Sequence, residues 1–276
     1  MEDEMNTVEQ NNGAGQQEQI VLSEMREHVG IITMNHNKKL NALSSELVQE
    51  VLDALSRLEA AEARVIILRA APGARVWSAG HNIKEVPLDG QDPVTWNVPF
   101  EKLLHRVHGC PLPVIGMIEG SVWGGACDLA MTCDLLVGTP TTTFAITPAK
   151  LGLSYNTAGV NHFLGVVPVH IVKQMLFTAQ PLPAEDAYRL GILNSLVAAE
   201  DLEAAALQFA NQIASRAPLA VKVLKKEVQS LTAGAGIQAD AFEEIQDMRR
   251  EVYRSEDFQE GIRAFFERRD PLFKGK

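Results

Sequence analysis

The chain has 276 residues, a formal net charge of −10 and a sequence pI of about 5.2. This length suits one large domain, or one domain with a small appendage, and 46% hydrophobic residues are enough for a packed core. The longest apolar runs, such as Val65–Leu68, are far too short to cross a bilayer. The acidic charge argues against a general nucleic-acid binder, because phosphates attract basic surfaces.

The three cysteines, Cys110, Cys127 and Cys133, are odd in number and have no CxxC spacing. This argues against a disulfide framework or a zinc site and predicts free thiols in a reducing cytoplasm. The histidine spacing does not demand a metal either, so we expect none. Residues 1–19 are polar and contain no stretch of the signal-peptide kind, which predicts a disordered tail and a cytoplasmic protein.

The first predicted elements are a strand hairpin and a helix. Residues 20–34 favour two strands with a turn near Glu27 and His28. Ser44 is a suitable N-cap for a helix that runs to about Glu59.

Short strands and helices then alternate. Residues 64–68 form a strand whose continuous apolar sequence predicts burial on both faces. The other expected strands are 76–79, 114–118, 135–137 and 143–146, and the expected helices are 99–107 and one that begins near Gly124.

After Asn156 the pattern is mostly helical. Helices are expected near 157–164, 168–177, 184–190, 201–215, 218–231, 238–252 and 256–267, and only 195–198 looks extended. Strands alternating with helices, followed by a run of helices, predict an α/β fold: a core over 20–200 that holds the active site, then a helical region over 201–276.

Two glycine-containing turns are the candidate site. Residues 78–82 follow a short strand, and residues 120–126 lie between a strand and a helix. Glycines let the backbone approach a ligand, and the first N–H groups of a helix favour negative charge. If the turns converge, the N–H groups of His81 and Gly125 share one oxygen as an oxyanion hole. Either turn alone is more often a tight structural loop.

These turns resemble two segments of the crotonase, or enoyl-CoA hydratase/isomerase, family. S-A-G-H-N-I-K-E at 78–85 is similar to the family's S-A-G-x-D-I-x-E, G-S-V-W-G-G-A at 120–126 to its second glycine segment, and L-N-A-L at 40–43 to its early motif. The resemblance covers 20–273 in order. It implies a spiral of ββα units, a C-terminal helical region for trimerisation, often a dimer of trimers, and an acyl-CoA substrate with no further cofactor.

Hydratases of the family usually carry two glutamates. At the first position this chain has Asp128, a shorter acid, and at the second it has Pro148, which has no acid or base. A hydration mechanism that uses two carboxylates is therefore in doubt.

Longer stretches narrow the resemblance. Residues 78–81, 119–126, 147–156, 248–250 and 255–261 are similar to family members that decarboxylate methylmalonyl-CoA. Loss of CO₂ leaves electrons that the thioester oxygen accepts as an enolate, so no base is needed. The preferred function is therefore a carbon–carbon lyase that converts methylmalonyl-CoA to propionyl-CoA and CO₂.

The resemblance also assigns residues. Tyr155 matches a tyrosine that meets the substrate carboxylate, although it also suits a partly buried core aromatic. Asp128 lies one helical turn from Gly125, where it would hydrogen-bond Tyr155 or fix the loop; it suits a catalytic acid as well as a solvated or structural one. The ring of His81 packs against substrate or faces solvent. Water is the default source of the final proton.

The phosphates of CoA need cations. The residues expected to bind CoA are Lys38, Lys39, Ala79, Lys84, Gly124 and Lys274, the last with Lys276 reaching a neighbour's adenine end in a trimer. Each lysine alone also suits a solvated surface. Two other functions stay open: another crotonase activity, such as hydration or isomerisation with Asp128 alone, and a non-catalytic acyl-CoA-binding protein, with RNA binding disfavoured by the acidic charge.

Overall fold

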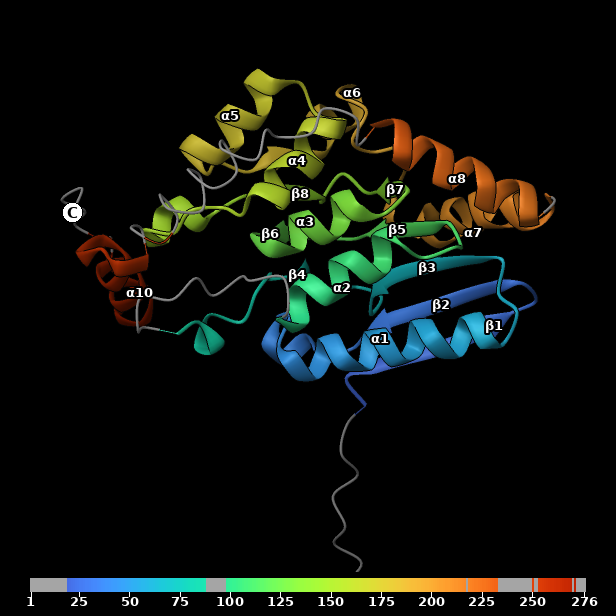
Figure 1. Cartoon of the computed structure of the whole chain (residues 1–276), viewed down its shortest axis with the longest axis horizontal. Helices are drawn as coiled ribbons and strands as arrows, with labels where there is room; N and C mark the ends of the chain where they lie inside the picture. The colour runs from blue at the N-terminus through green and yellow to red at the C-terminus, as the bar shows by residue number, and fades with distance from the viewer. Residues whose placement is uncertain are drawn as a thin grey trace, which may run out of the picture.

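The computed structural model describes residues 19–87, 98–216, 218–232, 250, 253–269 and 271, so the tail predicted over 1–19 lies almost wholly outside it. Figure 1 shows strands at the centre with helices packed around them, which is the α/β class predicted. Over these residues, no helix combines the length and apolar character needed to cross a membrane.

Strands β1 (Val21–Arg26) and β2 (Val29–Met34) form the predicted antiparallel hairpin. Its turn contains Glu27 in the left-handed region, with φ 55°. Helix α1 (Ser45–Ala60) follows, and the Ser44 hydroxyl accepts a hydrogen bond from the backbone N–H three residues later. The predicted N-cap is therefore confirmed.

The larger sheet has the order β1-β2-β3-β5-β7-β10, and every neighbouring pair after the first is parallel. Its remaining strands are β3 (Val65–Ala70), β5 (Val114–Ile118), β7 (Leu135–Gly138) and β10 (Ser195–Leu196). All six residues of β3 are buried, as its continuous apolar sequence predicted.

Both faces of this sheet are covered. Ile66 and Leu68 of β3 join the main core with α1, whereas Val65 and Ile67 pack with the helix α7 (Leu202–Ala214). That helix contributes Leu202, Ala206, Ala210 and Ala214, which follow one another at helical spacing.

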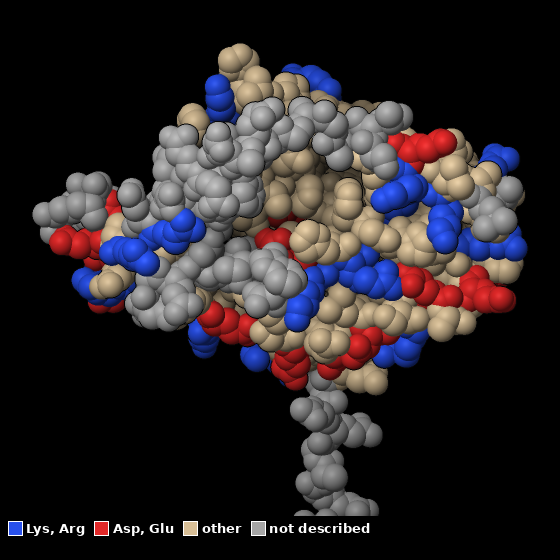
Figure 2. Space-filling view, in the orientation of Figure 1, with Lys and Arg blue, Asp and Glu red and all other residues tan. Residues whose placement is uncertain are grey.

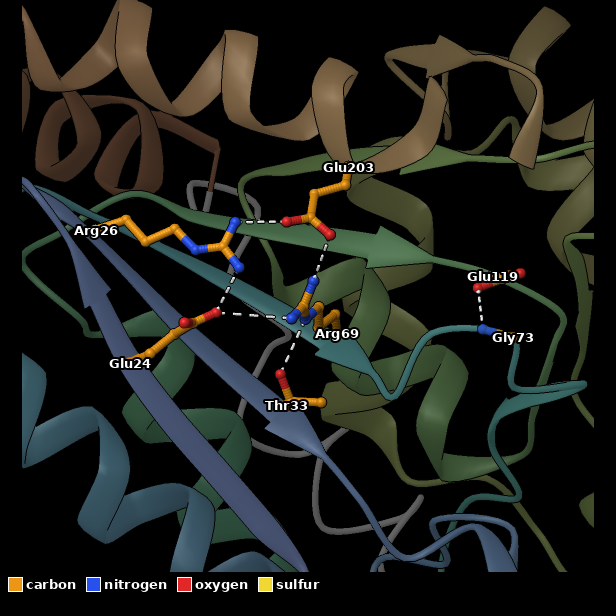
Figure 3. Close-up of polar contacts among 7 residues, drawn as sticks. All are labelled: Glu24, Arg26, Thr33, Arg69, Gly73, Glu119 and Glu203. Atoms are coloured by element: carbon orange, nitrogen blue, oxygen red, sulfur yellow. Dashed lines mark hydrogen bonds and ion pairs between the residues drawn. The ribbon is translucent and has the colours of Figure 1, made fainter. Parts of the chain in front are cut away.

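An ionic network ties α7 to the sheet (Figure 3). Arg69 of β3 is only 8% exposed. Its guanidinium donates to Glu203 of α7 at 3.0 Å and to Thr33 of β2 at 2.9 Å, and lies 3.7 Å from Glu24 of β1. Arg26 bridges the same two carboxylates. The buried guanidinium of Arg69 therefore has partners on three elements, α7, β2 and β1.

The second sheet has the order β4-β6-β8-β9, with β4 (Val76–Ser78), β6 (Ser121–Trp123), β8 (Thr143–Ala145) and β9 (Leu182–Pro183). Two of these strands correct the sequence analysis. Residues 121–123 were interpreted as part of a glycine turn, and 182–183 were not expected to be extended. Both strands are too short to show a periodic pattern, and pairing defines them: β6 pairs with β4 and β8, and β9 pairs with β8.

The remaining helices agree with the predicted ranges within a few residues. They are α2 (Pro99–His108), α3 (Gly125–Thr132), α4 (Thr157–Val166), α5 (Val169–Thr178), α6 (Ala184–Arg189), α8 (Pro218–Thr232) and α10 (Glu256–Glu267), with 3-10 turns η1 (Asn37–Lys39), η2 (Ile83–Glu85), η3 (Pro148–Leu151) and η4 (Ala199–Asp201). The helix predicted over 238–252 lies outside the described residues except for Arg250.

Candidate active site

The two glycine turns lie against each other. A Cβ atom built on Gly80 would lie 2.3 Å from the carbonyl oxygen of Trp123 and 2.9 Å from the nitrogen of Gly125. One built on Gly125 would lie 3.5 Å from the nitrogen of His81. Gly80 also has φ 81°, a conformation that other residues rarely adopt. Glycine at position 80 therefore allows the close approach that brings the two amides together.

The second sheet explains this meeting. Strands β4 and β6 are parallel neighbours, so the residues that directly follow them, 79–81 and 124–125, emerge at the same edge. The first turn is also held by the L-N-A-L segment, because Leu43 N–H donates to the Gly80 carbonyl at 2.8 Å and Ala79 N–H donates to that of Leu40 at 2.9 Å.

The amides of His81 and Gly125 are available to a ligand. Gly125 is the first residue of α3, so its N–H has no partner within the helix. In the described part of the chain, neither N–H donates to a backbone carbonyl. The α3 dipole adds partial positive charge at Gly125. This arrangement suits an oxygen that gains negative charge, and the shared oxygen stays a prediction.

Both turns line one pocket of about 100 Å³. Its wall is mainly apolar, with polar groups at a few points, as is usual for sites that bind small molecules. Beside both turns, the lining residues include Ile83, Val86, Phe100, Asp128, Pro148, Leu153, Tyr155 and Tyr253.

The side chain of His81 packs in this wall rather than facing solvent. Its ring meets the ring of Phe100 edge to face, with centroids 5.9 Å apart. Burial lowers the pKa of His81, against a smaller opposing effect of Glu85. The ring is therefore neutral at pH 7, and the backbone N–H remains the part of His81 predicted to take part in an oxyanion hole.

Tyr155 stands between η3 and α4, with its ring against Phe163 and its hydroxyl 3.4 Å from the Gly124 carbonyl oxygen. Burial, followed by the charge of Asp128, raises the pKa of Tyr155 well above its ordinary value. The hydroxyl therefore stays a neutral hydrogen-bond donor in the pocket where the sequence placed it.

Asp128 lies on α3 and is 1% exposed. Its Oδ1 meets Nδ1 of His162, on α4, at 2.6 Å. Sequence reasoning missed His162. A weak signal was its place in α4. Gly159 and Phe163 are the buried residues of this helix, and His162 lies three residues after the first and directly before the second.

The second carboxylate of the hydratases is absent from its position, as the sequence indicated. Pro148 occupies the pocket wall there and opens η3. A buried acid that sequence reasoning did not consider, Glu101 of α2, accepts a hydrogen bond from Asn156 just outside the lining. Asp128 is the single carboxylate among the described lining residues.

Of the residues predicted to bind CoA, Ala79 and Gly124 line the pocket. Lys38 and Lys39 are exposed on η1, and Lys84 is exposed on η2. Lys274 lies outside the described residues. Figure 2 shows a hollow on one face of the molecule with Lys and Arg side chains along part of its rim. Across the described ranges, no group of three or more His, Cys, Asp and Glu residues is placed to hold a metal ion.

Comparison with known proteins agrees with this geometry. The family model described as enoyl-CoA hydratase/isomerase matches residues 24–276. Methylmalonyl-CoA decarboxylase of Escherichia coli (strain K12) is 45% identical over 247 residues, which cover 90% of this chain and 95% of that protein. Short-chain-enoyl-CoA hydratase of Clostridium acetobutylicum is 29% identical over 255 residues, with coverage of 90% and 95%.

Solved structures give the same result. A methylmalonyl-CoA decarboxylase in complex with 2-nitronate-propionyl-CoA superposes with a TM-score of 0.91 at 44% identity, covering 94% of this chain and 99% of that one. A second complex, with 2S-carboxypropyl-CoA, has the same TM-score and coverage. The family match over residues 24–276, together with the contact between the two glycine turns and the pocket that both line, establishes that the chain belongs to the enoyl-CoA hydratase/isomerase family.

Proposed function

We propose that the chain decarboxylates methylmalonyl-CoA to propionyl-CoA and CO₂. The observation that carries the proposal is the meeting of two unused backbone amides, His81 and Gly125, in a pocket where Pro148 replaces the second acid of a hydratase. The similarity to methylmalonyl-CoA decarboxylases over nearly the whole chain supports the choice of substrate.

The chemistry needs little from the side chains. The bond between the α-carbon and the carboxylate breaks, CO₂ leaves, and the bonding electrons move through the α-carbon onto the thioester oxygen. Two N–H groups stabilise that oxygen, and each such donor contributes about 3–4 kcal/mol in comparable sites. No base is required, so the loss of the second acid has no cost for this reaction.

Tyr155 is assigned to the leaving carboxylate. Its neutral hydroxyl, which donates to the Gly124 carbonyl at 3.4 Å, would turn its proton to the carboxylate and orient it without neutralising its charge. The apolar wall disfavours the charged group relative to CO₂. The pocket would thereby hold the breaking bond perpendicular to the thioester plane.

The binding and assembly of the enzyme are part of the same proposal. Lys38, Lys39 and Lys84 are placed to meet CoA phosphates, and no cofactor beyond the CoA of the substrate is needed. A homotrimer or a dimer of trimers in the cytoplasm, formed through the helical region 201–276 and its neighbours, would cover apolar side chains such as Phe177.

Separate incubations with methylmalonyl-CoA and crotonyl-CoA, followed by mass spectrometry, test the function. We expect rapid propionyl-CoA formation from the first and negligible hydration of the second. Fast formation of 3-hydroxyacyl-CoA without propionyl-CoA would favour a hydratase in which Asp128 acts as the single catalytic acid. Binding of both thioesters without turnover of either would instead favour a non-catalytic binding protein.

A further inference from the structure

The inner wall of the pocket contains an ionic pair that the reaction above leaves unused. Asp128 reaches it from α3 and His162 from α4, with Oδ1 and Nδ1 2.6 Å apart. The other oxygen, Oδ2, is buried and has no hydrogen-bond partner among the described residues. Asp128 lines the pocket, so its carboxylate lies beside the space that a bound group would occupy, and Oδ2 has capacity for a further hydrogen bond.

The close packing of α4 at Gly159 places Oδ2 beside the ring of Tyr155, which also lines the pocket. A Cβ atom built on Gly159 would lie 2.5 Å from Oδ2 of Asp128 and 2.5 Å from Cε1 of Tyr155. Oδ2 of Asp128 and the ring of Tyr155 therefore both lie against Gly159, which has no side chain. The substrate carboxylate assigned to Tyr155 would leave from beside this oxygen.

Accepting the proposed function, we propose that Asp128 is the catalytic acid that protonates the α-carbon of the enolate, and that His162 positions it and supplies its proton. The reaction needs such a donor, because the electrons left by CO₂ must end in a new C–H bond. Among the described lining residues the alternatives are weaker: Tyr155 holds its proton tightly and the buried ring of His81 is neutral.

The pair is also connected to solvent on its far side. The His162 side chain is 23% exposed, and its ring stacks on that of His108, an exposed residue of α2, at 6.1 Å between centroids. Protons can therefore reach His162 without passing through the pocket.

The charged groups around His162 keep a proton on the pair. Burial lowers the pKa of His162, but the hydrogen bond and charge of Asp128, with the charge of Glu101, outweigh this and raise it. The adjacent His108 has a pKa lowered by burial and by the charge of His162 itself. The proton thus belongs to the inner pair.

The step balances as follows. The proton of His162 Nδ1 moves to the Asp128 carboxylate, which gives a neutral imidazole and a carboxylic acid. Rotation about Cβ–Cγ presents the acid to the pocket. Its O–H bond breaks as the enolate electron pair forms a C–H bond at the α-carbon and the thioester carbonyl is restored. Solvent then protonates the imidazole.

Turnover in D₂O tests this role directly. Unlabelled methylmalonyl-CoA gives propionyl-CoA whose α-carbon carries hydrogen, deuterium and methyl, so it is chiral. We expect one enantiomer from the wild type, because the donor is fixed on one face, and a nearly racemic product from Asp128→Asn, because water then protonates both faces. NMR of the product after derivatisation with a chiral auxiliary measures the ratio.

A second variant tests His162 without removing its hydrogen bond. In His162→Asn the amide NH₂ replaces Nδ1 as a donor to Asp128 but does not titrate. We expect kcat of the wild type to fall as pH rises through the raised pKa of His162, and we expect this alkaline fall to be absent from the variant, whose kcat is about 10²-fold lower at neutral pH. His105→Asn, an exposed histidine of α2, is the matched control and should keep the wild-type profile.

The outcomes separate the two proposals. No CO₂ release by the wild type overturns the function and this inference with it. Two outcomes with normal CO₂ release overturn the donor pair alone. One is a racemic product from the wild type. The other is an unchanged enantiomeric ratio in Asp128→Asn together with an unchanged pH profile in His162→Asn. If Asp128→Asn does not fold, the His162→Asn profile decides.

Discussion

At the scale of single residues, the candidate site depends on backbone N–H groups, which cannot be recognised from the types of side chain in the sequence. The proposed oxyanion donors are backbone N–H groups, so their spacing depends on the glycines that let the two turns approach each other. Gly80 is the point where one turn contacts the other, since an added Cβ would lie 2.3 Å from the carbonyl oxygen of Trp123. Backbone atoms at that distance cannot move aside cheaply, and a larger residue would push the two amides apart.

Replacing Gly80 by alanine should therefore lower kcat for CO₂ release by about 10²–10³-fold, the cost of losing one oxyanion donor. Gly73→Ala is a matched control, because Gly73 has a similar φ of 77° but open space around its Cβ position. Steady-state kinetics of both variants, with thermal unfolding as a check of fold, provide the measurement. Equal kcat in the two variants would contradict the importance of the close approach.

The Tyr155 hydroxyl can be removed without disturbing the ring that packs on Phe163. A hydrogen bond to a charged group contributes about 1.5–3 kcal/mol. We therefore expect Tyr155→Phe to fold normally and to lose about 10- to 100-fold in kcat/KM. Kinetics unchanged from the wild type would remove the hydroxyl from the mechanism.

At the scale of elements, α7 shows how a helix is fixed on a buried sheet. Its small inward residues allow close packing, but Arg69 carries a charge into the same interface and depends on Glu203. Without the charge of Glu203, the buried guanidinium of Arg69 would keep only Thr33 and the 3.7 Å contact with Glu24. The attachment of α7 is therefore sensitive to one carboxylate at its first turn.

Glu203→Gln should lower the free energy of unfolding by about 1–3 kcal/mol, with little change in kcat because the pocket lies elsewhere. Urea unfolding measures the loss, and Glu200→Gln, an exposed carboxylate of η4, is the control.

The hydrogen bond from Arg26, and then the charge of Arg69 against burial, lower the pKa of Glu203. Its contribution is thus present above the unfolded value of about 4.3 and is lost as pH falls through the lowered pKa. A pH-independent difference between the two variants would argue against the charge as the cause.

Other elements show where local signals suffice. The hairpin, α1 and β3 were predicted because a turn, a cap and a continuous apolar run are properties of neighbouring residues. Strands β6 and β9 were missed because two or three residues show no period, and their extended form depends on pairing with neighbouring strands.

At the scale of the whole molecule, large apolar side chains are exposed on α5 and α10. Phe177 of α5 is 75% exposed and lies beside Phe265 and Arg269 in a second hollow. Such a surface suits contact with further copies of the chain.

A charge at this position should therefore change the assembly. We expect the wild type to be a trimer or hexamer by light scattering and Phe177→Glu to shift to smaller species, because burying an unpaired carboxylate in a contact is costly. Leu22→Glu, at a less exposed apolar residue of β1, is the control for an added charge. A wild-type monomer, or an unchanged mass in Phe177→Glu, would contradict the proposed interface.

The sequence by itself determined the α/β class, most helices, the two glycine turns and the absence of a second acid at Pro148, because each is written in residues that are neighbours along the chain. Only the tertiary structure decided that the turns touch and that Asp128 meets His162, 34 residues away on another helix. Periodicity reports which face of an element is buried, but not which partner it is buried against. The packing of α4 on α3 at Gly159, and of β4 beside β6, supplied those partners.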